Sequence, residues 1–133
     1  MPYDLRRTIP KERRPKLQLH YDEDGLQLQS EKELGYAGTL TFYGRLRTGA
    51  DAKAINDQMI TVDEDGDQSV RAGSSMFLKV LSTVTEIDGL YDGETPVTQM
   101  TDQVLGMLPE WMLAELRDWS DKLNSKTKKK AGE

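Results

Sequence analysis

Few residues of this sequence could do chemistry. His20 is the only histidine and there is no cysteine, so thiolate chemistry is excluded and histidine-assisted catalysis has one candidate base. No strand-to-helix nucleophile elbow accompanies His20, and a Ser-His-Asp triad therefore cannot be built. The phosphate-binding patterns GxxxxGK[ST] and GxGxxG are also absent. We therefore expect a protein that is not an enzyme and that uses no cofactor.

Two acidic turns are the remaining candidates for a metal site. The string Asp-Glu-Asp-Gly occurs at 22–25 and again at 63–66. A calcium loop of the EF-hand type needs an oxygen ligand at its first position, Gly at its sixth and Glu at its twelfth. With Gly66 in sixth place the twelfth residue is Ala72, and in the earlier turn the loop would begin at His20. Both turns depart from the pattern, so we expect no tight calcium site and no other metal site.

Charge is strongly segregated along the chain. Residues 1–16 carry six basic and two acidic side chains, and residues 122–133 carry five and one, so each end has a net charge of +4. The segment between them carries 7 basic and 20 acidic residues, a net charge of −13. Because nucleic-acid binding needs a contiguous basic face, this acidic body disfavours it.

Composition indicates one domain with charged ends. Apolar residues make up 36% and charged residues 31% of the 133 residues. Dense charge and proline predict a flexible basic arm over residues 1–16, and a flexible basic tail over 125–133. A single domain is expected over 17–124. No apolar run is long enough to span a membrane, the N-terminal arm does not resemble a secretory signal, and the lack of cysteine fits a reducing cytoplasm.

Strand patterns occupy the first part of this domain. Apolar and polar residues alternate from Leu17 to Tyr21 and lead into the first acidic turn, which predicts a β-hairpin over 17–29. Residues 39–47 predict a further strand, with Gly44 at a bulge or bend. The apolar face of that strand is expected to hold Leu40, Phe42 and Leu46.

Two helices are predicted in the middle of the chain. Residues 50–60 favour a short helix capped by Asp51, and residues 74–87 favour the main core helix, capped by Ser74 or Ser75. The inward residues of the first are expected to be Ala54, Ile55 and Met59. In the second, apolar residues recur at helical spacing at Met76, Phe77, Val80, Leu81, Val84 and Ile87.

Two more helices are predicted after an acidic, glycine-containing loop at 88–94. Thr98 is expected to cap a short helix that ends at Gly106, and Pro109 to open a final helix that ends at Asn124. The final helix has one amphipathic stripe, formed by Met112, Leu116, Trp119 and Leu123. The predicted fold class is therefore α+β: a small, mainly helical domain with a few N-terminal antiparallel strands and flexible basic termini.

Large apolar side chains are concentrated where the last two helices meet. Trp111 and Trp119 are eight residues apart, which separates them by about 80° around a helix axis. One reading is that these side chains fill the core. The other is that one tryptophan is an exposed anchor in a docking face for a partner. The candidate partner-binding residues are Met107, Leu108, Trp111, Met112, Leu116 and Trp119.

Three short segments of the C-terminal half match the pattern of a known family: 84–90 (VTEIDGL), 96–98 (PVT) and 108–110 (LPE). Through them the C-terminal half resembles the tail assembly chaperones of long-tailed (siphovirus-type) bacteriophages. In that family an apolar helix leads into an acidic glycine-containing loop, and a Leu-Pro step opens the last helix. The strand expected at 39–47 is also similar to an early strand of the family.

This resemblance implies a protein that binds an apolar helical client, the tape measure protein, and keeps it soluble during tail assembly. It also implies possible contact with tail tube subunits, a location in the host cell cytoplasm and absence from the mature particle. Two alternatives from other classes stay open. One is a structural virion component, such as a head–tail joining or minor tail protein, and the other is a regulatory nucleic-acid-binding protein acting through its basic tails. Self-association into a homo-oligomer is also left open.

Overall fold

Four α-helices and a four-stranded antiparallel sheet form the main body of the chain. The computed structural model describes residues 2, 4, 8–62, 68–70 and 72–125. The helical elements are η1 (Lys11–Arg13), α1 (Gly49–Met59), α2 (Ala72–Thr83), α3 (Asp102–Met107) and α4 (Glu110–Leu123). The strands are β1 (Lys16–Asp22), β2 (Gln27–Leu28), β3 (Tyr36–Gly44), β4 (Ile60–Val62), β5 (Gln68–Val70), β6 (Val84–Asp88), β7 (Tyr91–Asp92) and β8 (Thr95–Pro96). The α+β fold class is confirmed.

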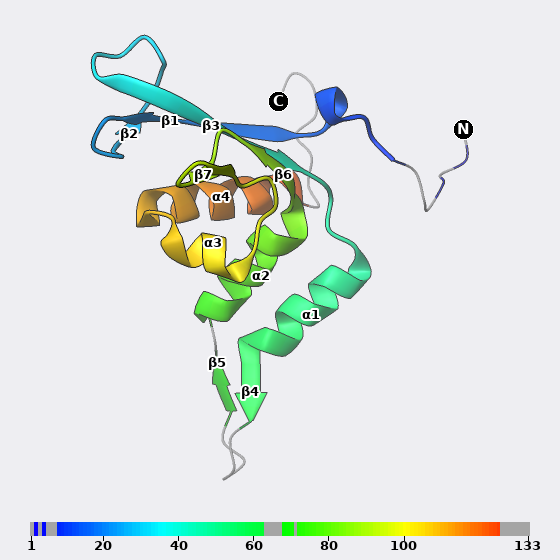
Figure 1. Cartoon of the computed structure of the whole chain (residues 1–133). Helices are drawn as coiled ribbons and strands as arrows, with labels where there is room; N and C mark the ends of the chain where they lie inside the picture. The colour runs from blue at the N-terminus through cyan, green and yellow to red at the C-terminus, as the bar shows by residue number, and fades with distance from the viewer. Residues whose placement is uncertain (1, 3, 5–7, 63–67, 71, 126–133) are drawn as a thin grey trace, which may run out of the picture.

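The main sheet has the strand order β2-β1-β3-β6, and helices α2, α3 and α4 lie on one side of it (Figure 1). Leu19 is paired with Leu40 across β1 and β3, and Phe42 with Ile87 across β3 and β6. Because side chains alternate between the faces of a strand, these four share the face that the helices cover. The predicted hairpin over 17–29 is thus confirmed. The strand predicted over 39–47 is present as β3, but it ends at Gly44, so Leu46 lies beyond it and is 61% exposed.

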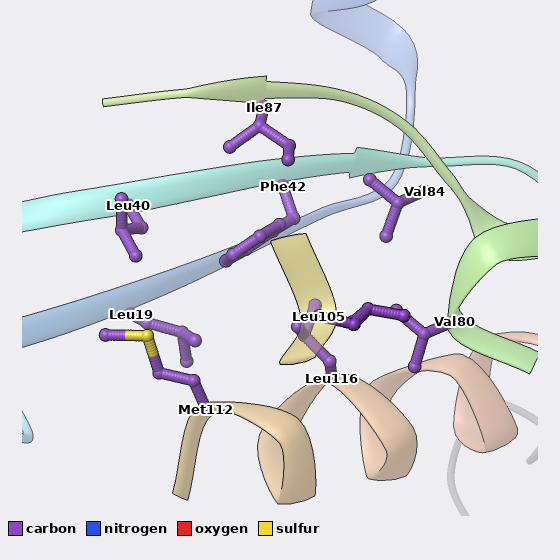
Figure 2. Packing of buried hydrophobic residues seen from close by; sticks show 9 residues of the cluster. All are labelled: Leu19, Leu40, Phe42, Val80, Val84, Ile87, Leu105, Met112 and Leu116. Carbon is purple, nitrogen blue, oxygen red and sulfur yellow. The ribbon is translucent and has the colours of Figure 1, made fainter. Parts of the chain in front are cut away.

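The core lies between this sheet and the helices (Figure 2). Nine apolar residues form it: Leu19, Leu40, Phe42, Val80, Val84, Ile87, Leu105, Met112 and Leu116. Each large side chain that is removed from water in this way contributes about 1.5–3 kcal/mol. Sheet and helices therefore stabilise one another, and α4 packs on β1 as well as on α2.

The segment predicted as one long helix is divided into a helix and a strand. Helix α2 begins at Ala72, ahead of the expected serine caps, and ends at Thr83; Val84–Asp88 then form β6. β-Branched residues are dense at this point, with Thr83, Val84, Thr85 and Ile87 in five positions. Such residues favour strands, and pairing with β3 overrides the helical spacing.

Helix α1 is capped by Thr48 and not by Asp51. The Thr48 hydroxyl accepts a hydrogen bond from the Asp51 amide at 3.3 Å, and the Asp51 carboxylate accepts one from the Thr48 amide at 2.8 Å. This reciprocal arrangement is a capping box. Of the predicted inward residues Ile55 is buried, whereas Ala54 is exposed.

Partial burial of the Asp51 carboxyl raises its pKa, but the hydrogen bonds from Thr48 and Arg45 outweigh that effect. The pKa of Asp51 is therefore lowered overall.

The bulge predicted at Gly44 is present, because the pairing of β3 with β6 shifts register between Tyr43 and Gly44. A Cβ atom at Gly44 would lie 2.6 Å from the Trp119 ring of α4 and 3.2 Å from the Thr83 carbonyl oxygen. Glycine at the bulge therefore permits the close approach of α4 to the sheet.

Part of the predicted basic arm contacts the sheet. Lys11 forms ion pairs with Glu86 and with Asp88 (3.1 Å), and its ammonium group lies 4.8 Å from the centre of the Tyr43 ring. The Pro15 carbonyl accepts a hydrogen bond from Gly44, and β1 already includes Lys16. Packing against the domain thus begins several residues before 17. The predicted tail lies outside the described residues, apart from Ser125.

Candidate protein-docking site

The polar candidates on the sheet are held in structural hydrogen bonds. His20 Nδ1 lies 2.8 Å from the Thr39 hydroxyl, which in turn lies 2.6 Å from the Tyr36 hydroxyl. This chain of three groups borders a polar hollow of about 470 Å³. Among the described contacts no carboxylate bonds the second ring nitrogen of His20, so the group that would orient a catalytic histidine is not seen there.

In the first acidic turn, the Asp22 carboxylate accepts hydrogen bonds from backbone amides of the same turn. Asp22 Oδ1 accepts hydrogen bonds from the amides of Asp24 and Leu26, both at 2.9 Å, which is an Asx turn. Across the described part of the chain, no group of three or more His, Asp or Glu side chains is placed to hold a metal ion. The second acidic turn, at 63–66, lies outside the described residues.

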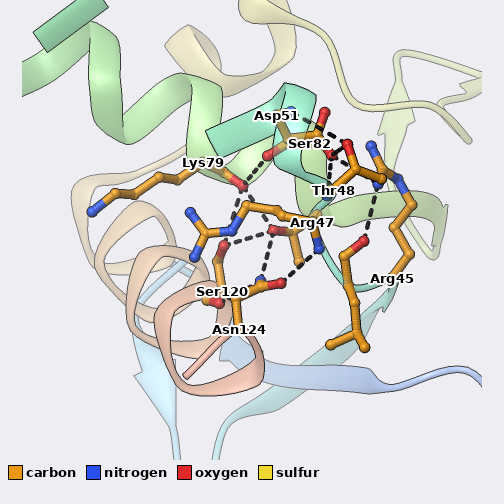
Figure 3. Close-up of polar contacts among 10 residues, drawn as sticks. Arg45, Arg47, Thr48, Asp51, Lys79, Ser82, Ser120 and Asn124 are labelled. Atoms are coloured by element: carbon orange, nitrogen blue, oxygen red, sulfur yellow. Dashed lines mark hydrogen bonds and ion pairs between the residues drawn. The ribbon is translucent and has the colours of Figure 1, made fainter. Parts of the chain in front are cut away.

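A polar network fixes the C-terminal end of α4 against α2 (Figure 3). The Thr83 and Ser120 hydroxyls lie 2.7 Å apart, and each also lies within hydrogen-bonding distance of the Lys79 carbonyl oxygen, at 2.8 and 3.1 Å. Asn124 accepts a hydrogen bond from the Arg47 amide at 2.6 Å, which ties the β3–α1 connection to the same helix end. These contacts set the position of α4.

Of the six residues predicted to bind a partner, two belong to the core. Leu116 is 0% exposed and cannot contact a partner while the domain is folded, whereas Met112 keeps 6% of its surface exposed. The amphipathic stripe was predicted correctly, but its central residues serve the fold. Full burial of Leu116 contradicts its assignment to a docking surface, whereas Met112, although mostly buried, lines a surface hollow beside Leu108 and Pro109.

The two tryptophans do not divide into a core residue and an exposed anchor. Both are partly buried and pack against the core. The Trp111 indole donates a hydrogen bond to the Gly25 carbonyl at 2.8 Å, which joins the N-terminal end of α4 to the β1–β2 turn. The Trp119 ring lies over Gly44. Both side chains hold α4 on the sheet.

The other two predicted residues, Met107 and Leu108, lie on an open apolar groove. Two adjoining hollows of about 260 and 390 Å³ share the side chains of Leu90, Tyr91, Met107 and Leu108. Met107 is 69% and Tyr91 61% exposed, whereas Leu108 is partly buried. Val97 and Val104 line the first hollow, and Pro109 and Met112 line the second. We call this surface the α3–β7 groove.

One wall of the groove is the loop that follows β6. Gly89 has a φ of +88°, and a Cβ atom there would lie 2.7 Å from the Thr39 carbonyl oxygen, so the position favours glycine on two grounds. The Leu90 carbonyl accepts a hydrogen bond from the Val97 amide at 2.8 Å, which closes the β7–β8 ribbon. These constraints hold Leu90 and Tyr91 beside α3.

The other wall is the junction of α3 with α4. Thr101, and not Thr98, caps α3 by accepting a hydrogen bond from the Val104 amide at 3.2 Å. The helix continues past Gly106 to Met107, and Pro109 then occupies the N-cap position of α4, as the sequence predicts within one residue. This sharp junction places Met107 and Leu108 at the groove.

The sequence analysis missed Leu90 and Tyr91. They are two adjacent apolar residues inside an acidic loop, and no periodicity links them to the helices. Their type was the only available signal, since large apolar residues are unusual in a loop that would otherwise be solvated.

The described part of the chain contains no helix that is both long and apolar enough to cross a membrane. Comparison with models of known protein families, with curated proteins and with solved structures finds no match.

Proposed function

We propose that the protein is a non-catalytic binding protein that holds an apolar segment of a client in the α3–β7 groove. The client would be the tape measure protein of a long-tailed bacteriophage, and the protein would act as its tail assembly chaperone. The observation that carries this proposal is the convergence of three segments on one groove. Segments 84–90, 96–98 and 108–110, on which the resemblance to that family rests, contribute Leu90, Val97 and Leu108 to its walls.

The physical character of the groove supports protein binding. Exposed large apolar side chains gathered around a concave surface are typical of interaction sites. Met107 adds adaptability, since methionine is flexible and can pack against differently shaped partners. A chaperone that must release its client benefits from such a shallow, adaptable contact repeated over many copies.

The charge distribution supports a role in keeping a client soluble. A body with a net charge of −13 between its basic ends would keep complexes apart in solution. We place this activity in the host cell cytoplasm and propose that the protein is absent from the mature particle. A structural virion component would instead remain in purified particles.

One observation speaks against the nucleic-acid alternative. Lys11, in the basic arm, is already neutralised by Glu86 and Asp88. A phosphate backbone would have to compete with these carboxylates.

The proposal can be tested by co-expression with the tape measure protein of the same phage. We expect Met107→Glu to reduce the soluble fraction of the client strongly, because it places a charge in the apolar groove. Leu46→Glu is the matched control, since Leu46 is similarly exposed but does not line the groove. Equal client solubility with both variants and the unchanged protein would overturn the proposal.

A further inference from the structure

The segment that forms most of the α3–β7 groove carries charges of a single sign. The sequence from 80 to 116, which contributes most of its walls, contains seven acidic residues and no lysine or arginine. No basic residue lines either hollow, whereas Asp92 lines the first. The elements that form the groove thus combine an apolar surface with an acidic border, and of the acidic residues Asp92 lines the groove itself.

Four of the acidic side chains in this segment are uncompensated. Asp92, Glu94, Asp102 and Glu110 are exposed, and within the described residues none of them forms an ion pair. Asp92 and Glu94 belong to the β7–β8 ribbon, Asp102 opens α3, and Glu110 opens α4. They thus stand on the elements that form both walls.

The other three acidic residues of the segment have partners. Glu86 and Asp88 pair with Lys11, and Glu115 accepts a hydrogen bond from Gln27 at 3.2 Å. Within the described residues a cation thus neutralises only Glu86 and Asp88 of the seven, and the remaining negative charge lies on the elements that form the groove.

We propose that the occupant of the groove is a cationic amphipathic segment of a partner protein, with apolar side chains flanked by lysine or arginine. This inference rests on the proposed function, because it specifies the chemistry of the client segment. The apolar side chains would fill the two hollows, and the flanking cations would meet the acidic border. Charges around an interface mainly raise the association rate and select between partners, and salt screens them.

Lys11, in the described part of the basic arm, does not occupy the groove. Lys11 holds the last turn of the arm against Tyr43, Glu86 and Asp88, on the face of the sheet opposite to the core. The second hollow is lined by Tyr21 and Leu40, whose side chains belong to the core side. Lys11 and the groove are therefore on different faces of the sheet.

The inference can be tested with three synthetic helical peptides of about 18 residues, long enough to form a helix. The first has a leucine stripe flanked by lysines, the second has the same stripe flanked by glutamates, and the third keeps the lysines but replaces the leucines with serines. Fluorescence anisotropy with the full chain would give each Kd at low and high salt. We expect the first peptide to bind at least about tenfold more tightly than the second at low salt, and this ratio to shrink at high salt.

Variants of the protein sharpen the test. The combined change Asp92→Asn, Glu94→Gln, Asp102→Asn and Glu110→Gln should abolish the preference for lysine while binding of the leucine stripe persists. A control with the same number of charges removed, Glu31→Gln, Glu33→Gln, Asp57→Asn and Asp118→Asn, changes four exposed carboxylates outside the groove and should keep the preference.

The outcomes separate this inference from the proposed function. Equal binding of the first two peptides, lost on Met107→Glu, would overturn the charge inference and leave docking in the groove standing. Failure of all the peptides to bind would overturn both. Binding of the serine peptide as tight as that of the leucine peptide, or binding that Met107→Glu does not weaken, would show a non-specific electrostatic contact and would also overturn the inference.

Discussion

Neighbouring residues of α3 and α4 serve two different apolar surfaces. Leu105 and Leu116 are fully buried in the core between the sheet and the helices. Met107 and Leu108 lie only a few positions away, yet they border a groove that no described element fills. Similar side chains on the same short segment therefore belong to two different surfaces. Whether a side chain is part of the core or of the groove depends on whether another element of the chain covers it.

The comparison also separates stability from binding. Removal of a core side chain leaves a cavity that the fold cannot fill, whereas truncation at the groove alters a surface that is already in water. If the groove were merely an imperfect part of the core, substitutions in the two regions would have similar effects. If the groove is a separate surface, substitutions there should leave the fold nearly unchanged, whereas substitutions in the core should destabilise it.

Leu116→Ala should have the largest effect. The side chain is fully buried, so we expect the free energy of unfolding to fall by about 2–5 kcal/mol. Met107→Ala should change it by no more than about 0.5 kcal/mol, because that side chain is mostly exposed. Urea denaturation of both variants measures the two values. Similar losses would mean that the groove and the core are one structural unit.

Gly44→Ala should be the next most damaging change. The added methyl group would meet the Trp119 ring and the Thr83 carbonyl, and overpacking of this kind costs about 1–3 kcal/mol. Combining it with Trp119→Leu should cost less than the two separate losses added together, because the smaller side chain removes the main clash. Thermal or urea unfolding of the single and double variants gives the coupling. Strict additivity would contradict the close approach of α4 to the β3 bulge.

Removal of the α1 cap should have a moderate effect. Thr48→Ala should lower the free energy of unfolding by about 1 kcal/mol, since it removes the acceptor for the Asp51 amide. Hydrogen exchange in α1 should become faster in the same variant, with little change in β1 and β3. Unchanged exchange in α1 would argue against the capping box.

The same cap predicts a dependence on pH. The pKa of Asp51 is lower in the folded chain, so its contribution to stability is fully present above the unfolded value of about 3.9 and is lost as pH falls through the folded value. The stability difference between the unchanged protein and Asp51→Asn should therefore shrink as pH falls below about 3.9. Urea unfolding at neutral and acidic pH would measure this, and a constant difference would contradict it.

Lys11→Gln should have the smallest effect on the fold. Its ion pairs with Glu86 and Asp88 are exposed to solvent, and such pairs add little to stability. We expect almost no change in melting temperature but faster proteolysis at residues 8–15. High salt should also make proteolysis of the unchanged protein at these residues faster, because it screens the same ion pairs. If the Lys11→Gln variant resists proteolysis as well as the unchanged protein does, contacts other than those of Lys11 hold η1.

Much of the fold could be predicted because the patterns were local. The alternation of apolar and polar residues around the first acidic turn predicts the hairpin. The amphipathic stripe of the last helix, together with Pro109 at its start, predicts α4. Strand β6 was hidden because Val84 and Ile87 continue the helical spacing of α2, and only their pairing with β3 decides their structure. Thr98 and Thr101 are equally good caps in sequence, but the Thr98 carbonyl bonds the Ile87 amide, which fixes it beside β6.

The site was less predictable than the fold. Met107 and Leu108 stood out because they belong to a dense apolar stretch, but so did Met112 and Leu116, which the sheet covers. The separation of these pairs depends on which helix face meets the sheet, and that is a long-range property. Leu90 and Tyr91 join the groove through the conformation of Gly89 and the β7–β8 ribbon, which the sequence pattern does not reveal.

Photo-crosslinking tests the docking of a client in the groove most directly. A p-benzoylphenylalanine residue would replace Met107 in one variant and Leu46 in another, since both positions are similarly exposed. Each variant would be co-expressed with the tape measure protein and irradiated. Our account predicts a crosslinked product from position 107 and little or none from position 46. Equal crosslinking at both positions, or crosslinking only at 46, would contradict binding of the client in the α3–β7 groove.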